Sequence, residues 1–160
     1  MSTNWRFLWV HVTVVLALLL LVMPLPAAVN LFRPDWPLLV LTYWVLALPH
    51  RISIGTAFVF GFLVDVMVGT ILGVNALGYS VVAFIVAANY AKIRNFSILQ
   101  QSLLIGLIFA FYHLLIFWLS HFLTGVSFRM AYLWPVLTSM ALWPYIFLFL
   151  RRFRRKLKMQ

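Results

Sequence analysis

The stretch LLIGLIFAFYHLLIFWL, residues 103–119, decides the class of fold. It contains no Asp, Glu, Lys or Arg, and as a helix it would be about 25 Å long at about 1.5 Å per residue. Residues 12–23 form a second unbroken apolar run. Transmembrane β-strands would instead show segments of about 10 residues in which apolar and polar side chains alternate. The sequence therefore predicts an all-α fold of membrane-spanning helices.

The composition of the whole chain agrees with a membrane protein. Of its 160 residues, 66% are hydrophobic and 9% are charged, whereas about 25% of residues are charged in soluble domains. The two carboxylates, Asp35 and Asp65, cannot give a domain of this size a surface suited to water. Lipid accepts apolar side chains on outward faces. Because the chain has no cysteine, disulfides and cysteine-bound metals are excluded.

Prolines, glycines and charged residues divide the chain into six predicted helices. Residues 36–48 are marginal for a full crossing, and together with the next segment they could form a re-entrant hairpin instead. The first segment could be a cleaved signal peptide, but its apolar region is longer than the usual length of about 7 to 15 residues. We therefore expect it to be retained. The predicted spans cover about residues 7–23, 36–48, 52–68, 74–90, 97–123 and 131–150, within one membrane domain, residues 1–150, that is followed by a basic tail, residues 151–160.

The basic residues predict the orientation in the membrane. Twelve Lys and Arg against two Asp give a net charge of +10, and basic residues of short loops favour the cytoplasmic side. With six spans and a cytoplasmic N-terminus, ten basic residues lie inside and two, Arg33 and Arg129, lie outside. Both termini are therefore predicted to be cytoplasmic. We expect the tail to lie on anionic lipid headgroups, or to dock on a cytoplasmic filament protein, rather than to bind nucleic acid; its basic residues are Arg151, Arg152, Arg154, Arg155, Lys156 and Lys158.

Asp65 is the carboxylate that lies within an apolar span, where an ionisable residue is costly and marks a candidate functional site. Asn75 and His113 are expected at a similar depth in the outer half, so we expect a buried cluster of the three. Asp65 could bond to nearby backbone, with His113 as an interhelical donor. The cluster could also act as a proton or ion relay, or contact a partner or ligand. Arg33 and Asp35 could pair with each other at the outer interface.

Catalysis is not expected from these residues. General acid–base chemistry usually needs two placed titratable groups, whereas Asp35 is predicted at the interface and Asp65 inside a span. The chain contains no His-Glu-x-x-His, phosphate-binding-loop or Gly-x-Ser-x-Gly motif. His113 and His121 are separated by about 80° around a helix, which is poor geometry for joint metal binding. We therefore expect neither a metal nor a cofactor.

Small residues one helical turn apart predict close packing between helices. Ala57 and Gly61 lie in the third predicted helix, and Ala83 and Ala87 lie in the fourth. Side chains this small let two helix backbones approach closely. Such pairs most often pack a protein's own bundle, although one could serve another chain.

The most specific motifs lie between residues 32 and 77. They are Phe32-Arg33-Pro34-Asp35-Trp36-Pro37, Ala47-Leu48-Pro49-His50-Arg51, Gly61-Phe62-Leu63-Val64-Asp65 and Leu72-Gly73-Val74-Asn75-Ala76-Leu77. Later stretches, Val126-Ser127-Phe128-Arg129 and Leu142-Trp143-Pro144, agree with them. On these motifs the chain resembles the MreD family of rod shape-determining proteins of Gram-negative bacteria.

That resemblance implies a non-catalytic component of the cell inner membrane, acting in the machinery that elongates the cell and builds peptidoglycan. The implied partners are MreC, by direct contact, and MreB, RodA and a class B penicillin-binding protein in the same complex. The implied fold is similar to the six-helix substrate-binding subunits of energy-coupling-factor vitamin transporters. A small-molecule-binding subunit of that type is the alternative function, although residues 14–21 lack its usual Ala-x-x-x-Ala pattern. The candidates for partner or ligand contact are Arg33, Asp35, Asp65, Asn75, His113 and Arg129.

Overall fold

The computed structural model describes residues 3–125, 127 and 129–157. This part of the chain is helical and contains no β-strand, which confirms the all-α prediction. Three short elements, α2 (Ala27–Asn30), α6 (Tyr90–Asn95) and the 3-10 helix η1 (Met130–Leu133), lie between longer helices. The longer helices are α1 (Thr3–Val22), α3 (Trp36–Ala47), α4 (Ile54–Val68), α5 (Val74–Ala88), α7 (Ile98–Thr124) and α8 (Trp134–Lys156).

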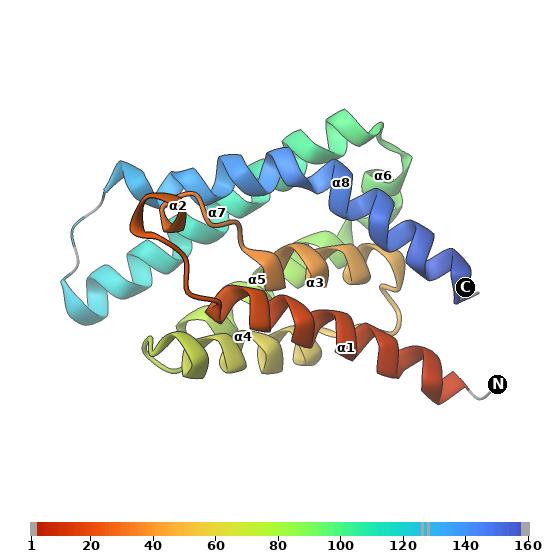
Figure 1. Cartoon of the computed structure of the whole chain (residues 1–160), viewed down its shortest axis with the longest axis horizontal. Helices are drawn as coiled ribbons and strands as arrows, with labels where there is room; N and C mark the ends of the chain where they lie inside the picture. Colours follow the sequence, from red (N-terminus) through yellow and green to blue (C-terminus); the bar gives the residue numbers. More distant parts are fainter. Residues whose placement is uncertain (1–2, 126, 128, 158–160) are drawn as a thin grey trace.

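The longer helices alternate in direction, so the chain has two distinct ends (Figure 1). Both termini and α6 lie at one end, where the Trp9 ring is 5.9 Å from the Phe153 ring and Arg51 lies 5.0 Å from the centre of the Phe7 ring. We call this the basic end, since it carries the bases of α6 and of the last turns of α8. The opposite end includes α2 and both Asp residues, and we call it the carboxylate end.

The central helix, α3, explains why residues 36–48 are marginal in length. Its 12 residues span about 18 Å, and α1, α5, α6 and α8 pack around it. Leu38, Leu39 and Trp44 are completely buried although they point in different directions. A helix that is apolar on all sides is a buried one. Because α3 is enclosed by protein, it does not need the length of a helix that faces lipid.

Two of the described helices, α7 and α8, are long and apolar enough to cross a membrane by length and composition. Shorter apolar helical stretches cover Phe7–Val22, Trp36–Ala47, Ile54–Val68 and Val74–Ala88. Large apolar side chains such as Leu107, Phe122 and Phe149 are exposed on the outer faces of α7 and α8. An exposed surface of this kind suits lipid rather than water.

The ends of two helices follow local sequence signals. Ser53 caps the start of α4 by accepting a hydrogen bond from the backbone of Thr56, and Gly69, with φ of 76°, ends it. Ser97 forms a capping box with Gln100 at the start of α7. Helix α8 continues past residue 150, where the predicted sixth span ends, and runs without a break through Arg151 to Lys156. Val126, Phe128 and Lys158 lie outside the described residues.

Candidate functional site

The Asp65 carboxylate is completely buried near the end of α4 and accepts five hydrogen bonds. Its Oδ1 atom accepts from the Thr70 hydroxyl at 2.7 Å, from the Asn75 side-chain amide at 2.9 Å and from the Asn75 backbone N–H at 3.1 Å. Its Oδ2 atom accepts from the backbone N–H groups of Gly73 at 3.0 Å and Ala76 at 3.2 Å. Every one of these donors belongs to the α4–α5 turn or to the first residues of α5.

Asp65 supplies hydrogen-bond acceptors and negative charge to the N-terminus of α5. The first N–H groups of a helix have no partner within it, and the end carries a partial positive charge of about half a unit. Gly73, at the cap position with φ of 99°, has no side chain to supply an acceptor. The carboxylate of the preceding helix supplies it instead. This arrangement matches the expectation that Asp65 bonds to backbone near the Gly69 turn.

Helices α4 and α5 approach closely where Asp65 joins them. A Cβ atom added to Gly61 would lie 2.6 Å from the Cα atom of Ala76 and 2.6 Å from the carbonyl oxygen of Asn75. Ala57, one turn earlier on α4, is also completely buried. The predicted small-residue pair of α4 therefore packs the protein's own bundle, and it positions the Asp65 oxygens within reach of the α5 N–H groups.

Tyr112, rather than His113, joins α7 to this network. The Tyr112 hydroxyl donates to Oδ1 of Asn75 at 2.5 Å, and its ring packs edge-on against Tyr79 at 5.8 Å. The structure thus brings Asp65 and Asn75 together as expected but not His113. Neighbouring residues of a helix point about 100° apart, so Tyr112 and His113 of α7 face different sides.

His113 belongs to a second polar centre at the carboxylate end. Its Nε2 atom lies 2.6 Å from Oδ2 of Asp35, with the ring N–H as donor because a carboxylate only accepts. The Asp35 side chain is 22% exposed and the His113 side chain 15% exposed. The backbone N–H of Asp35 donates to the buried hydroxyl oxygen of Ser139 at 3.2 Å. This centre therefore ties the start of α3 to α7 and α8.

The two remaining candidates of the carboxylate end do not join either centre. Arg33 donates to the backbone carbonyls of Leu21 and Met23 at the end of α1, where a helix carries partial negative charge. In the described part of the chain, the Asp35 carboxylate contacts His113 and not Arg33, so the expected pairing of Arg33 with Asp35 is not seen. Arg129 is exposed in the connection between α7 and η1.

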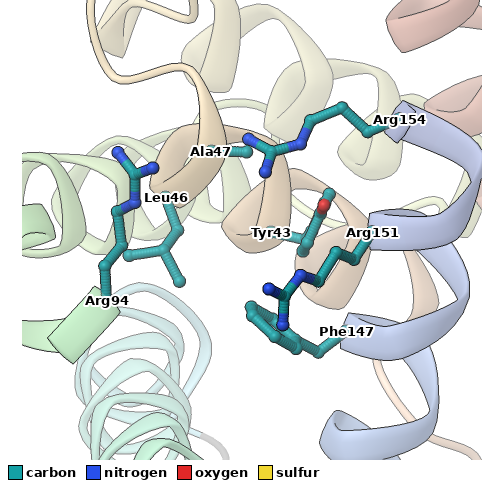
Figure 2. A pocket seen from close by; sticks show the side chains of 7 residues that line it. All are labelled: Tyr43, Leu46, Ala47, Arg94, Phe147, Arg151 and Arg154. Carbon is teal, nitrogen blue, oxygen red and sulfur yellow. The ribbon is translucent and has the colours of Figure 1, made fainter. Parts of the chain in front are cut away.

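The basic end holds a cavity of about 190 Å³ between α3, α6 and α8. Arg94, Arg151 and Arg154 line it (Figure 2). Arg152, Arg155 and Lys156 of the predicted tail are exposed on α8 and do not line the cavity. Residues 3–125, 127 and 129–157 contain no group of three His, Asp or Glu side chains placed to hold a metal ion.

A comparison with known protein families identifies the chain. The family model described as rod shape-determining protein MreD matches residues 1–153. The chain belongs to the MreD family. The rod shape-determining protein MreD of Haemophilus influenzae is 38% identical over 161 residues, which cover 99% of this chain and 99% of that protein. No solved structure matches the chain.

The MreD match covers both polar centres of the carboxylate end, because all their residues lie between 35 and 139. The family resemblance predicted from the sequence is thereby confirmed. Thr70, Tyr112 and Ser139, which complete these centres, are not predicted from the sequence. Thr70 and Tyr112 stand beside predicted residues, at the Gly69 turn and before His113. No comparable signal marks Ser139.

Proposed function

We propose that the chain is a multi-pass protein of the cell inner membrane with six spans and both termini in the cytoplasm. The observation that carries this proposal is the separation of charge along the bundle. The basic end holds Arg51, the bases of α6 and those of α8, whereas both carboxylates lie at the opposite end. Basic residues favour the cytoplasmic side. The basic end is therefore the cytoplasmic end.

The alternating direction of α1, α3, α4, α5, α7 and α8 supports six spans. Helices α4 and α5 have 15 residues each, about 22 Å, which is shorter than a hydrocarbon core of about 30 Å. A short span is accommodated by local thinning of the bilayer at a modest cost. Helix α3 is shorter still, but protein surrounds it.

A role without catalysis in cell elongation and peptidoglycan synthesis fits the MreD family and the geometry of Asp65. Its two oxygens are occupied by five hydrogen bonds within the bundle, so the carboxylate serves the fold. A small-molecule-binding subunit, the alternative function, would need polar groups that are free to meet a ligand. Instead, the Asn75 side chain donates a hydrogen bond to Asp65 and accepts one from Tyr112.

We place the contact with MreC at the carboxylate end, and MreB, RodA and a class B penicillin-binding protein in the same complex. Support comes from the apolar side chains that this end exposes around α2 and η1. Leu31 and Phe32 are about half exposed, and Met130 is more exposed still. An exposed apolar surface of this kind, bordered by polar groups such as Arg129, is typical of protein contacts.

Three experiments test separate parts of the proposal. Since the chain lacks cysteine, Asn95→Cys at the basic end and Asn30→Cys at the carboxylate end provide a matched pair for labelling in intact cells. A reagent that does not cross the membrane should label only the Asn30→Cys variant; the reverse pattern would invert the topology. Deletion should make rod-shaped cells round, and the tagged chain should co-purify with MreC. A normal rod after deletion would exclude the role in cell shape.

A further inference from the structure

The cavity at the basic end has no role in the proposed function. It lies where the end of α3 meets α6 and α8, and its volume is about 190 Å³. In Figure 2, Arg94 reaches it from α6, and Arg151 and Arg154 reach it from α8. The lining consists of Tyr43, Leu46, Ala47, Arg94, Phe147, Arg151 and Arg154.

Three guanidinium groups of like charge share this cavity, and no described residue supplies a counter-charge there. Both Asp side chains lie towards the carboxylate end, and Asp35 at the start of α3 is about 12 Å along the helix from Tyr43, the nearest α3 residue of the lining. In the described structure, Arg94, Arg151 and Arg154 form no ion pair. The C-terminal end of α3 offers about half a unit of negative charge, which offsets only part of three positive charges. Arg151 and Arg154 are half-buried, where repulsion between like charges is stronger than in water.

Tyr43 adds an unsatisfied donor to the same cavity. Its side chain is 2% exposed, and its hydroxyl has no hydrogen-bond partner among the residues that the structure describes. In the view of Figure 2 this hydroxyl lies between the guanidinium groups of Arg151 and Arg154. A buried hydroxyl without a partner is destabilising. The cavity therefore gathers donors and positive charge, and it lacks an acceptor with negative charge.

We propose that this cavity binds the phosphate group of an anionic phospholipid. Phosphate supplies several acceptor oxygens and negative charge, and guanidinium groups match its geometry. Bound there, it would accept from Tyr43 and neutralise Arg151 and Arg154. In the proposed topology the basic end lies at the cytoplasmic headgroup layer, where basic pockets between helices bind such lipids.

An apolar groove beside the cavity favours a lipid over a soluble phosphate. The groove has a volume of about 240 Å³ and lies between α1, α3 and α8. It shares two helices with the cavity: Val40 of the groove is three residues from Tyr43 on α3, and Ile146 directly precedes Phe147 on α8. An acyl chain in this groove would cover the apolar side chains Leu16, Ala17, Leu20, Trp36, Val40, Ile146, Phe149 and Leu150.

The test measures lipid binding to the full-length chain purified in detergent, by native mass spectrometry. The probes are phosphatidylglycerol, phosphatidylcholine with the same acyl chains, and inorganic phosphate. We expect phosphatidylglycerol to bind at least about tenfold more tightly than phosphatidylcholine, because only the former carries net negative charge. Millimolar inorganic phosphate should not displace it, since phosphate makes no contact with the groove.

Three variants separate this site from general attraction to the basic surface. Tyr43→Phe should weaken phosphatidylglycerol binding about tenfold, the effect of one hydrogen bond to a charged group. It should not lower the melting temperature of the lipid-free chain, because its hydroxyl has no partner to lose. Arg151→Gln with Arg154→Gln should weaken binding about a hundredfold. Arg152→Gln with Lys156→Gln removes the same charge from exposed positions outside the cavity and should change affinity about twofold at most.

Four results would overturn the proposal. They are equal affinity for the two lipids, equal losses in the two double variants, displacement by inorganic phosphate alone, and unchanged affinity for phosphatidylglycerol in the Arg151/Arg154 variant. If that variant does not fold, Tyr43→Phe and Arg94→Gln decide the question. The assay involves neither cell shape nor MreC, so its failure would leave the proposed function in place.

Discussion

Tyr112 donates a hydrogen bond of 2.5 Å to Oδ1 of Asn75, while the side-chain nitrogen of the same Asn75 donates to Asp65 at 2.9 Å. One asparagine side chain thus connects α7 to α4 and α5. The amide orientation is fixed, because its oxygen faces a donor and its nitrogen faces an acceptor. All three side chains are buried, so water cannot replace a lost partner. The network should therefore contribute measurably to stability.

Replacing Tyr112 with Phe should destabilise the chain. The substitution removes one hydroxyl and leaves the Asn75 oxygen buried without a donor, which costs about 1–2 kcal/mol. The measurement is the free energy of unfolding of the purified chain in detergent. Tyr145→Phe is the matched control, because Tyr145 on α8 is 73% exposed. Equal losses in the two variants would show that the hydrogen bond to Asn75 contributes nothing.

Asp65→Asn should be more damaging, although it preserves size and shape. In either orientation the new amide directs N–H donors at N–H or hydroxyl donors, so at least two buried groups lose their acceptor. Loss of the negative charge at the α5 N-terminus adds to this. We expect a loss of about 3 kcal/mol or more in the free energy of unfolding. Thr70→Val, which removes one donor from the same carboxylate, should have a smaller effect. A stable Asp65→Asn variant would contradict the capping role.

Gly61→Ala tests the close approach of α4 and α5. The added Cβ atom would meet backbone atoms of Ala76 and Asn75 at 2.6 Å, so the helices must separate and the Asp65 hydrogen bonds must lengthen. Overpacking of this kind costs about 1–3 kcal/mol. The control is Gly55→Ala on the same helix, where the nearest atom is Ser53 Oγ at 3.5 Å. Since alanine favours a helix over glycine, the control should be neutral or stabilising, and destabilisation of both variants alike would contradict the packing argument.

The sequence predicts the parts of these centres that are formed by residues close together in the chain, but not the contact that α7 contributes. Asp65 stands out because a carboxylate in an apolar span needs a partner, and Gly69 and Gly73 mark the turn that brings Asn75 near it. The choice between Tyr112 and His113 depends on how α7 is rotated. Helix α7 carries apolar residues on all its faces, and lipid-facing and core-facing side chains of a membrane protein are of the same apolar types. The sequence therefore does not show which face of α7 is buried.

The basic cavity could not be predicted from the sequence because its residues lie far apart in the chain. Arg94 and Arg151 lie 57 positions apart, and only the packing of α6 and α8 around the end of α3 makes them neighbours. The sequence predicts both on the cytoplasmic side, which fits their common position at one end. It does not predict that Arg151 and Arg154 line a cavity from a continuous helix. The stripe of Leu150, Phe153 and Leu157 that packs against the core explains this placement.

The Asp35–His113 contact should show energetic coupling in a double-mutant cycle. Asp35→Asn and His113→Gln each remove one partner of the 2.6 Å contact, so the double variant should lose less stability than the two single losses combined. Because both side chains are partly exposed, the coupling should be about 1 kcal/mol and should weaken at high salt. His11→Gln is the control partner, since the His11 ring bonds to the Phe7 carbonyl on α1 and shares no partner with Asp35. Coupling of Asp35 to His11 as strong as its coupling to His113 would contradict the direct contact.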